Sequence, residues 1–393
     1  MIMKRKFILL LCCLLLSGCK EKVSDKIPSN LDISLNNTTL EVHSIVYLNE
    51  LIDSSNMTIL SDNALIDTTK IGTFEYEIKY ELDNKKYLYK IDINIVDTVS
   101  PKIYGASSRT ILKGYQYGVC NLVLIGDNYD KEPNCDIEGE YNLNKVGTYN
   151  LKLNVSDKSG NEVIHNMVVN VVEKFNNVVT GTQSNILFED VYAKYKTDKT
   201  ELGIDVSEWQ GEVDFNKVKE AGATFVFMRI GVQGAVEGEI KEDKYFEQNL
   251  KNAKKAGLKV GVYLYSTATT VEKAKEHANW VINRLNGEKL DLQVVFDWEN
   301  WAYWNFYKIS FYDINVVADT FINAINNAGY EGMLYGSASY LKNIWENRND
   351  FPIWLAHYTT KTNYEGKYSI WQFTDKGRID GIEGDVDFNV LYR

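Results

Sequence analysis

The chain has 393 residues, of which 45% are hydrophobic and 25% charged, as in ordinary globular proteins. This length allows two or three domains and a sizeable core. The formal net charge of −11 argues against nucleic acid as the main partner.

The first residues have the pattern of an export signal. Met3–Lys6 is basic, and Phe7–Leu16 is an apolar run too short to span a bilayer. The run ends in Leu16-Ser17-Gly18-Cys19, which resembles the bacterial lipobox, where the peptide is cut before the cysteine and the thiol is lipidated. A plain secretory signal with an incidental cysteine is the alternative. We therefore predict a lipoprotein signal peptide at 1–18, a tether at 19–30, and an extracytoplasmic protein held on the bacterial membrane through Cys19.

Two cysteines, Cys120 and Cys135, remain in the predicted mature domains. In an oxidising compartment they form either a disulfide that closes a short loop or two unpaired thiols, and the sequence leaves both open. The histidines are scattered and adjoin no cysteine, so no metal-ligand spacing is present. We expect no metal site and no cofactor.

Residues 31–174 have the pattern of two related β modules. Strand-like alternation marks Glu75–Tyr80 in the first half and Asn150–Val155 in the second. The halves also share motifs: Lys70–Phe74 matches Lys145–Tyr149, and Ile93–Asp97 matches Val169–Glu173. We infer that residues 31–98 and 99–174 are copies of one unit, each with enough short strands for a small β-sandwich.

These copies resemble the bacterial immunoglobulin-like (Ig-like) modules of cell-surface proteins. The second copy carries more of the resemblance, through Val155–Asn161 and the preceding Asp97–Pro101, whereas the first lacks the Ser-Gly-Asn turn. The resemblance implies a spacer, or an adhesive module that contacts the cell wall or a surface protein, and no catalysis.

From residue 201 onward, strand-like and helical patterns alternate. Residues 175–200 are rich in Asn, Thr and Lys and indicate a linker. The strand-like runs that follow are Gly203–Val206, Thr224–Ile230, Lys259–Tyr265, Leu292–Trp298, Glu331–Tyr335, Ile353–His357 and Tyr368–Phe373. Helical patterns between the first five predict a parallel sheet, and about eight strands indicate an α/β TIM-like (β/α) barrel over 201–393. Functional groups of such barrels lie at the carboxyl ends of the strands.

Two acids end the fourth of these strands. Asp297 and Glu299 are separated by Trp298, so strand alternation places both carboxylates on one face, with Cα atoms about 6.6 Å apart. The pattern alone is short, and two loop-edge acids that cap a helix or bind a cation would also explain it. Its place at the end of a barrel strand favours chemistry, because buried acids are costly without a role.

Two more acids are expected beside this pair. Asp205 closes the first strand and Asp387 lies in the last segment, and the first and last strands of a closed barrel are neighbours. The alternative is that Asp205 and Asp387 only pin the barrel seam by hydrogen bonds.

Aromatic residues at matching strand ends are predicted to form the walls of a substrate site. They are Tyr263, Tyr265, Trp354, Tyr358 and Trp371. Core packing is the alternative for Tyr263 and Trp371, because inward aromatic side chains fill barrels. Trp301 and Trp304 follow the fourth strand and either shape a subsite or cover the barrel mouth. Carboxylates with aromatic walls, and no Ser or Cys paired with His, indicate glycosidic bond cleavage.

Five motifs in this domain together resemble glycoside hydrolase family 25, the lysozymes typified by the fungal Chalaropsis enzyme. They are Gly203–Ser207 with Trp209–Gly211, Asp297-x-Glu299, Trp354-x-Ala356-x-Tyr358, Trp371–Phe373 and Val386–Asn389. The resemblance covers the whole C-terminal domain. It implies a retaining muramidase that cleaves the β-1,4 bond between N-acetylmuramic acid and N-acetylglucosamine in the glycan strands of peptidoglycan.

The resemblance also implies roles for the acids. Glu299 would be the general acid that protonates the leaving oxygen. Asp297 would assist the second step, by orienting the substrate's N-acetyl group or by stabilising positive charge. Asp205 and Asp387 would line the same pocket and hold sugar or tune the pair.

The predicted function is therefore a membrane-anchored muramidase for cell-wall remodelling or local wall opening. One alternative is a non-catalytic, glycan-binding surface lipoprotein. Another is that the β modules are the functional part and bind wall polymer or a partner protein.

Overall fold

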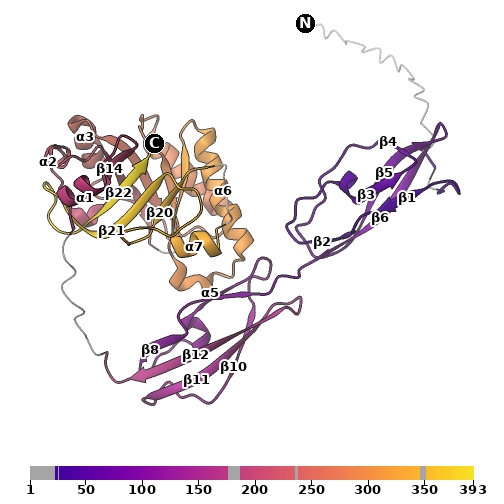
Figure 1. Cartoon of the computed structure of the whole chain (residues 1–393), viewed down its shortest axis with the longest axis horizontal. Coiled ribbons are helices and arrows are strands. Elements are labelled where there is room, and N and C mark those ends of the chain that lie inside the picture. The colour runs from indigo at the N-terminus through magenta and orange to yellow at the C-terminus, as the bar shows by residue number, and fades with distance from the viewer. Residues whose placement is uncertain (1–22, 25, 176–185, 235–237, 346–350) are drawn as a thin grey trace, which may run out of the picture. The chain divides into compact units, whose positions relative to one another are not determined.

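The computed structural model describes the chain apart from residues 1–22, 25, 176–185, 235–237 and 346–350. The predicted signal peptide and its Cys19 lie outside these described residues. The chain divides into two compact units, Met1–Thr98 and Val99–Arg393 (Figure 1). Within the described part, no helix combines the length and apolar character that crossing a bilayer requires.

The first unit is a β module with two sheets. Its strands are β1 (Ile33–Leu35), β2 (Thr39–Glu41), β3 (Ile52–Ser55), β4 (Thr58–Ile59), β5 (Gly72–Leu82) and β6 (Lys85–Val96). One sheet has the order β2-β6-β5-β4, and β1 pairs with β3 in the other. Asp83 and Asn84 connect β5 to β6 with positive φ angles of 51° and 60°, as a tight hairpin turn requires.

The second unit begins with a β module of the same topology, which we call the second β module (residues 99–174). Its strands are β7 (Lys102–Tyr104), β8 (Ser108–Leu112), β9 (Leu124–Gly126), β10 (Asn134–Glu138), β11 (Gly147–Ser156) and β12 (Glu162–Val172). The sheets are β8-β12-β11-β10 and β7-β9, and β8 is parallel to β12 as β2 is to β6. The repeated motifs occupy the same ends of the same strands, so the sequence repeat is a structural repeat. Cys120 and Cys135 form a disulfide, the first of the two arrangements that the sequence left open.

The rest of the second unit is an α/β barrel (Figure 1). Its strands are β13 (Ile186–Leu187), β14 (Thr200–Val206), β15 (Phe225–Gln233), β16 (Ile240–Glu242), β17 (Lys259–Tyr265), β18 (Val294–Asp297), β19 (Gly332–Ser337), β20 (Ile353–Ala356), β21 (Ile370–Arg378) and β22 (Val386–Tyr392). Its α-helices are α1 (Phe188–Tyr195), α2 (Phe215–Glu220), α3 (Phe246–Ala256), α4 (Val271–Leu285), α5 (Trp304–Tyr307), α6 (Phe311–Asn327) and α7 (Ala338–Asn343).

The barrel closes through its last strand. β14, β15, β17, β18, β19, β20 and β21 follow one another in parallel, and β22 pairs with both β21 and β14 in the antiparallel sense. β22 is antiparallel because it follows β21 directly, without the crossover connection that a parallel pair needs. Part of the segment expected to be a linker is ordered: Ile186–Leu187 pairs with β21, and Phe188 and Val191 of α1 are buried in the barrel's core.

Strand alternation divides the barrel's core into two layers. Inward side chains such as Phe225, Phe227 and Val295 form one buried cluster, whereas Val226 and Phe296 belong to the larger cluster between strands and helices. A Cβ atom on Gly261 would lie 2.3 Å from the ring of Phe227, so the neighbouring strand leaves room for this inward aromatic side chain.

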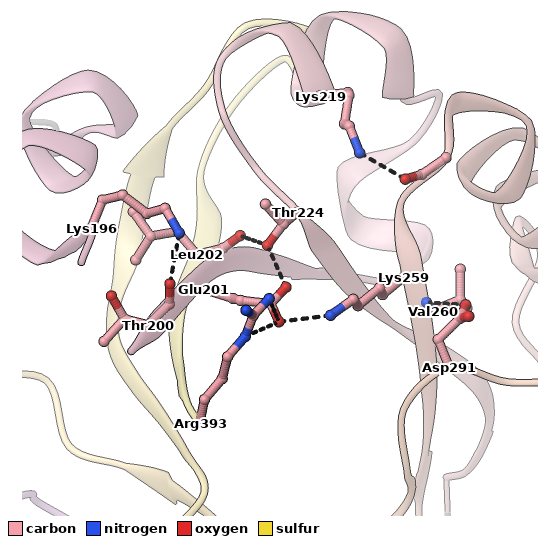
Figure 2. Close-up of polar contacts among 11 residues, drawn as sticks. Lys196, Thr200, Glu201, Leu202, Lys219, Thr224, Lys259, Val260, Asp291 and Arg393 are labelled. Atoms are coloured by element: carbon pink, nitrogen blue, oxygen red, sulfur yellow. Dashed lines mark hydrogen bonds and ion pairs between the residues drawn. The ribbon is translucent and has the colours of Figure 1, made fainter. Parts of the chain in front are cut away.

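Near the amino end of β14, buried Glu201 joins three parts of the barrel (Figure 2). Its Oε1 accepts hydrogen bonds from Lys259 Nζ at 2.7 Å and Arg393 Nε at 2.8 Å, and Thr224 Oγ1 donates to Oε2 at 3.1 Å. Although burial alone would raise the pKa of Glu201, these donors hold it below its ordinary value. The C-terminal residue is thereby tied to the first and third strands.

Glu201→Gln is expected to destabilise the barrel by about 1–2 kcal/mol near neutral pH, because the ion pairs are lost while Lys259 and Arg393 are half exposed. The lowered pKa means that Glu201 stabilises the fold above the unfolded-state pKa of about 4.5, and that this contribution fades as the pH falls. Thermal melts should show a gap between variant and wild type that narrows from pH 7 to about pH 3. Exposed Glu220, changed to Gln, is the control. An equal gap at both pH values would contradict this role.

Candidate active site

The four predicted acids meet at one end of the barrel. Asp205 lies near the end of β14, Asp297 ends β18, Glu299 follows it, and Asp387 lies near the start of β22. Asp205 and Asp387 are paired across the seam between β14 and β22. All four line a single pocket of 260 Å³. The tertiary structure therefore brings together acids that lie far apart in the chain: Asp205 and Asp387 are 182 residues apart.

Alternation along β18 sets the direction of the acidic pair. Asp297 points inward and is buried, whereas Trp298 points outward into the helical layer, where its Nε1 donates to the Ala268 carbonyl at 2.9 Å. Glu299 lines the pocket with Asp297 and is exposed to solvent. One carboxyl group of the pair is thus held inside the barrel, and the other lies where solvent reaches it.

Asp205 is held by two amide side chains that the sequence interpretation gave no role. Gln372 Nε2 donates to Asp205 Oδ2 at 3.0 Å, and Asn389 Nδ2 donates to the same oxygen at 2.7 Å. Trp354 Nε1 in turn donates to Asn389 Oδ1 at 2.8 Å. Gln372 lies in the motif Trp371–Phe373 and Asn389 in the motif Val386–Asn389, so these two motifs were the sequence signal that could have pointed to both amides.

Tyr335 also lines the pocket without having been predicted. Its hydroxyl donates to Gln372 Oε1 at 2.8 Å, and Tyr358 donates to the same oxygen at 3.1 Å. Tyr335 is the register neighbour of Asp297 on β19, so its ring stands beside the acidic pair. A tyrosine within an apolar strand carries no signal that separates it from core packing.

The pKa of every carboxyl group in the pocket is raised, chiefly because surrounding protein atoms displace water. The pKa of Asp297 is raised well above its ordinary value by burial, and further by Glu299 and Asp205. The pKa of Glu299 is raised mainly because protein atoms displace water from around its carboxyl group, and further by Asp205, whereas the Tyr335 hydroxyl lowers it. The pKa of Asp387 rises to about 9, through burial and then the charge of Asp205. The pocket therefore retains protons near neutral pH.

Arg229 is the cation among the residues that line the pocket. It is buried on β15, where its Nε donates to Asp243 Oδ2 and its Nη2 to Glu208 Oε1, both at 2.8 Å. Its charge lowers the pKa of Asp297 and so favours the ionised form of this acid against burial. A charged residue inside the apolar run Phe225–Ile230 was the sequence signal for this role, and the sequence interpretation missed it.

Four of the five predicted aromatic residues line the pocket: Tyr263, Tyr265, Trp354 and Tyr358. Trp371 does not. It alternates with the inward Gln372 and so faces outward, where it contacts Tyr195 of α1 and donates to the His357 carbonyl at 2.9 Å. Of the two explanations that the sequence left open for Trp371, core packing is the correct one. Trp209, 82% exposed, completes the pocket's rim.

The pocket's carboxylates do not form a compact metal-ligand set. Among the described residues, no three of these four acids bring one oxygen each within 4.8 Å of one another. Carboxyl groups with raised pKa values can transfer protons and, when ionised, stabilise positive charge.

A closed α/β barrel with carboxyl groups and aromatic walls at the carboxyl ends of its strands has the site of a glycoside hydrolase. Residues 204–382 match the glycosyl hydrolases family 25. The C-terminal half of the chain is therefore a family 25 glycosyl hydrolase domain, as its motifs predicted.

Relatives of this domain include proteins named as lysozymes. The autolytic lysozyme of Clostridium acetobutylicum is 32% identical over 189 residues, which are 48% of this chain and 54% of that protein. Lysozyme M1 of Streptomyces globisporus is 29% identical over 206 residues, 48% of this chain and 66% of the relative. A family 25 glycosyl hydrolase structure from Bacillus anthracis aligns with 54% of this chain and 95% of its own, at 24% identity and a TM-score of 0.45. The chain thus spans about half the length of the clostridial relative.

Proposed function

We propose that the protein is a muramidase that cleaves the β-1,4 bond between N-acetylmuramic acid and N-acetylglucosamine in peptidoglycan. The observation that carries the proposal is the convergence of Asp205, Asp297, Glu299 and Asp387 in one pocket of a family 25 domain. Two relatives of this domain are named as lysozymes. The aromatic walls suit a sugar ring, which presents apolar faces and a polar edge.

In this proposal Glu299 is the general acid. Its pKa is raised above the ordinary value, which favours the protonated carboxyl group, and its exposure lets the glycosidic oxygen of a polymer reach that proton. After the leaving group departs, the same carboxylate takes a proton from the attacking water.

Asp297 assists from inside the barrel. Its Oδ1 is buried and has no hydrogen-bond partner among the described residues, an arrangement that costs free energy unless a ligand supplies a donor. The N–H of a substrate N-acetyl group is such a donor, so Asp297 would orient that group for attack on the anomeric carbon. Asp297 would also stabilise positive charge on the sugar when it is ionised, and Arg229 acts against the raised pKa of Asp297 in favour of that form. Asp205 and Asp387 hold sugar hydroxyls and tune this pair.

The identity of the digestion products tests the reaction. Purified peptidoglycan treated with the protein should release fragments whose new reducing end, after borohydride reduction and mass spectrometry, is N-acetylmuramic acid. A new N-acetylglucosamine reducing end would instead identify a glucosaminidase. Protein that binds the wall and releases nothing would support the non-catalytic alternative.

We further propose that Cys19 is lipidated and holds the mature protein on the outer side of the bacterial membrane, with Ig-like modules before the enzyme. The basic and apolar residues before Leu16–Cys19 and the matching topology of the two modules support this arrangement. The first module would serve as a spacer or contact the wall. Metabolic labelling with an alkyne fatty acid should label the wild type and not Cys19→Ala, and an unlabelled wild type would overturn the anchor.

A further inference from the structure

The segment that follows Glu299 lies between the barrel and the second β module. We call residues 301–311 the Trp segment; it contains Trp301, helix α5 and the first residue of α6. Residues 120–127 of the second β module, which we call the docking segment, include β9. Both belong to the compact unit Val99–Arg393.

Asn305 on α5 is the polar centre of this contact. Its Oδ1 accepts from the backbone N–H of Ile125 at 2.9 Å, and its Nδ2 donates to the carbonyls of Val123 at 2.9 Å and Cys120 at 3.2 Å. The neighbouring Trp304 is 2% exposed, and its Nε1 donates to the Ile125 carbonyl at 2.9 Å. Two adjacent side chains of the Trp segment thus bind the backbone of β9 as a further strand would.

Close packing surrounds these hydrogen bonds. A Cβ atom on Gly126 would lie 2.4 Å from the ring of Phe311, whose backbone N–H donates to the Asp127 carbonyl at 2.7 Å. The Phe311 ring stacks on Trp304 at 5.2 Å. Ion pairs Lys308–Glu132 and Lys131–Asp313, at 2.8 and 2.9 Å, flank the contact. Position 126 therefore needs glycine, because a larger residue there would collide with the Phe311 ring where the second β module meets the barrel.

The Trp segment is also joined to the acidic pair. The N–H of Trp301 donates to the carbonyl of Glu299 at 2.7 Å. The ring of Trp298, between Asp297 and Glu299, contacts those of Trp301 and Trp304 at 4.6 and 6.1 Å. Trp304 therefore contacts the second β module on one side and Trp298, between the two acids, on the other.

We propose that the second β module is a positioning part of the catalytic unit, in which Asn305 and Gly126 fix the Trp segment and thereby the backbone that carries Glu299. A module that only spaced the enzyme from the membrane would need neither the buried Trp304 bond nor the threefold bonding of Asn305. The expected change in kcat rests on the proposed muramidase activity, whereas the contact between the second β module and the Trp segment does not.

Asn305→Ala and Gly126→Ala in the full chain test the proposal. A displaced Glu299 should lower kcat about 10–100-fold on soluble glycan fragments, with KM within about twofold, because misplacement of a reacting group by about 1 Å has effects of this size. A displaced Glu299 also changes its distance from Asp205 and Tyr335, which act on its pKa, and this moves the alkaline limb of the kcat profile. Loss of stability alone would not change this limb when assayed well below Tm.

Matched controls lie outside the contact, one in the second β module and one in the barrel. A Cβ atom on Gly118 would have Asn121 Nδ2 at 4.0 Å as its nearest neighbour, so Gly118→Ala should behave as wild type. Asn323 is exposed on α6, and Asn323→Ala serves for Asn305. Test variants with wild-type kcat and pH profile would overturn the proposal.

Hydrogen exchange on the wild type gives a reading that needs no variant. The N–H groups of Ile125 and Phe311 bond across the contact, so they should exchange as slowly as those of β18. If these two N–H groups exchanged as fast as those of surface loops, the proposed contact would be overturned, and this result does not depend on whether a variant folds. A wild type that cleaves nothing would refute the muramidase proposal and leave this reading intact.

Discussion

Glu299→Gln is expected to lower the rate of reducing-end release from purified peptidoglycan about 10²–10⁴-fold, which is the factor that general acid catalysis contributes. Gln keeps the shape of the side chain and has no proton to give to the leaving oxygen. The loss should appear in kcat, with binding to peptidoglycan retained. Exposed Glu220 lies elsewhere on the barrel, so Glu220→Gln is the matched control. Wild-type activity in Glu299→Gln would overturn the assignment of the general acid.

The same variant makes a prediction about stability with a defined sign. The pKa of Glu299 is raised in the folded protein, so ionisation opposes folding above the unfolded-state pKa of about 4.5. Gln removes this opposition, and the Tm of Glu299→Gln near neutral pH should equal or exceed that of the wild type. The difference should vanish below about pH 4, where Glu299 is protonated in both states. A lower Tm near neutral pH would show that the variant is inactive through misfolding.

Asp297→Asn is expected to lower kcat about 10²–10³-fold, as the loss of one preorganised electrostatic partner does. Asn is neutral, so it stabilises positive charge poorly and orients the N-acetyl N–H less strongly than a carboxylate. The buried Oδ1 without a partner is the structural reason to expect a large effect. Asp198→Asn, at an exposed site, is the control.

The choice of substrate separates the two roles of Asp297. If this acid orients the N-acetyl group, the ratio of wild-type to variant rate should fall toward one on de-N-acetylated peptidoglycan, where the group is missing. If it stabilises charge, the ratio should stay the same on both substrates. Equal rates of variant and wild type on acetylated peptidoglycan would exclude both roles.

The barrel and its acidic pair could be predicted because they depend on local patterns. Two-residue alternation alone sets Asp297 and Glu299 on one face and Trp298 on the other, and the closed barrel brings Asp205 beside Asp387. The repeat of the β modules was equally visible, since both copies carry similar residues at the same strand ends.

Residues whose role depends on a distant partner could not be assigned in this way. Trp371 and Gln372 are adjacent in sequence, and only the register of β21 shows that the amide points to Asp205 while the indole packs under α1. Arg229 is held in place by its hydrogen bonds to Asp243 and Glu208, and neither of these acids is its neighbour in the chain.

The sequence by itself thus determined the order of the domains, the barrel and the carboxyl groups that would meet in it, because periodicity and motif spacing are local. Only the tertiary structure decided what surrounds those groups: the amides that hold Asp205, the cation beside Asp297, and the second β module against the Trp segment. Asn305 bonds to residues 180 to 185 positions earlier in the chain. Such contacts form through shape and hydrogen-bond complementarity between surfaces that only folding creates, which no local pattern encodes.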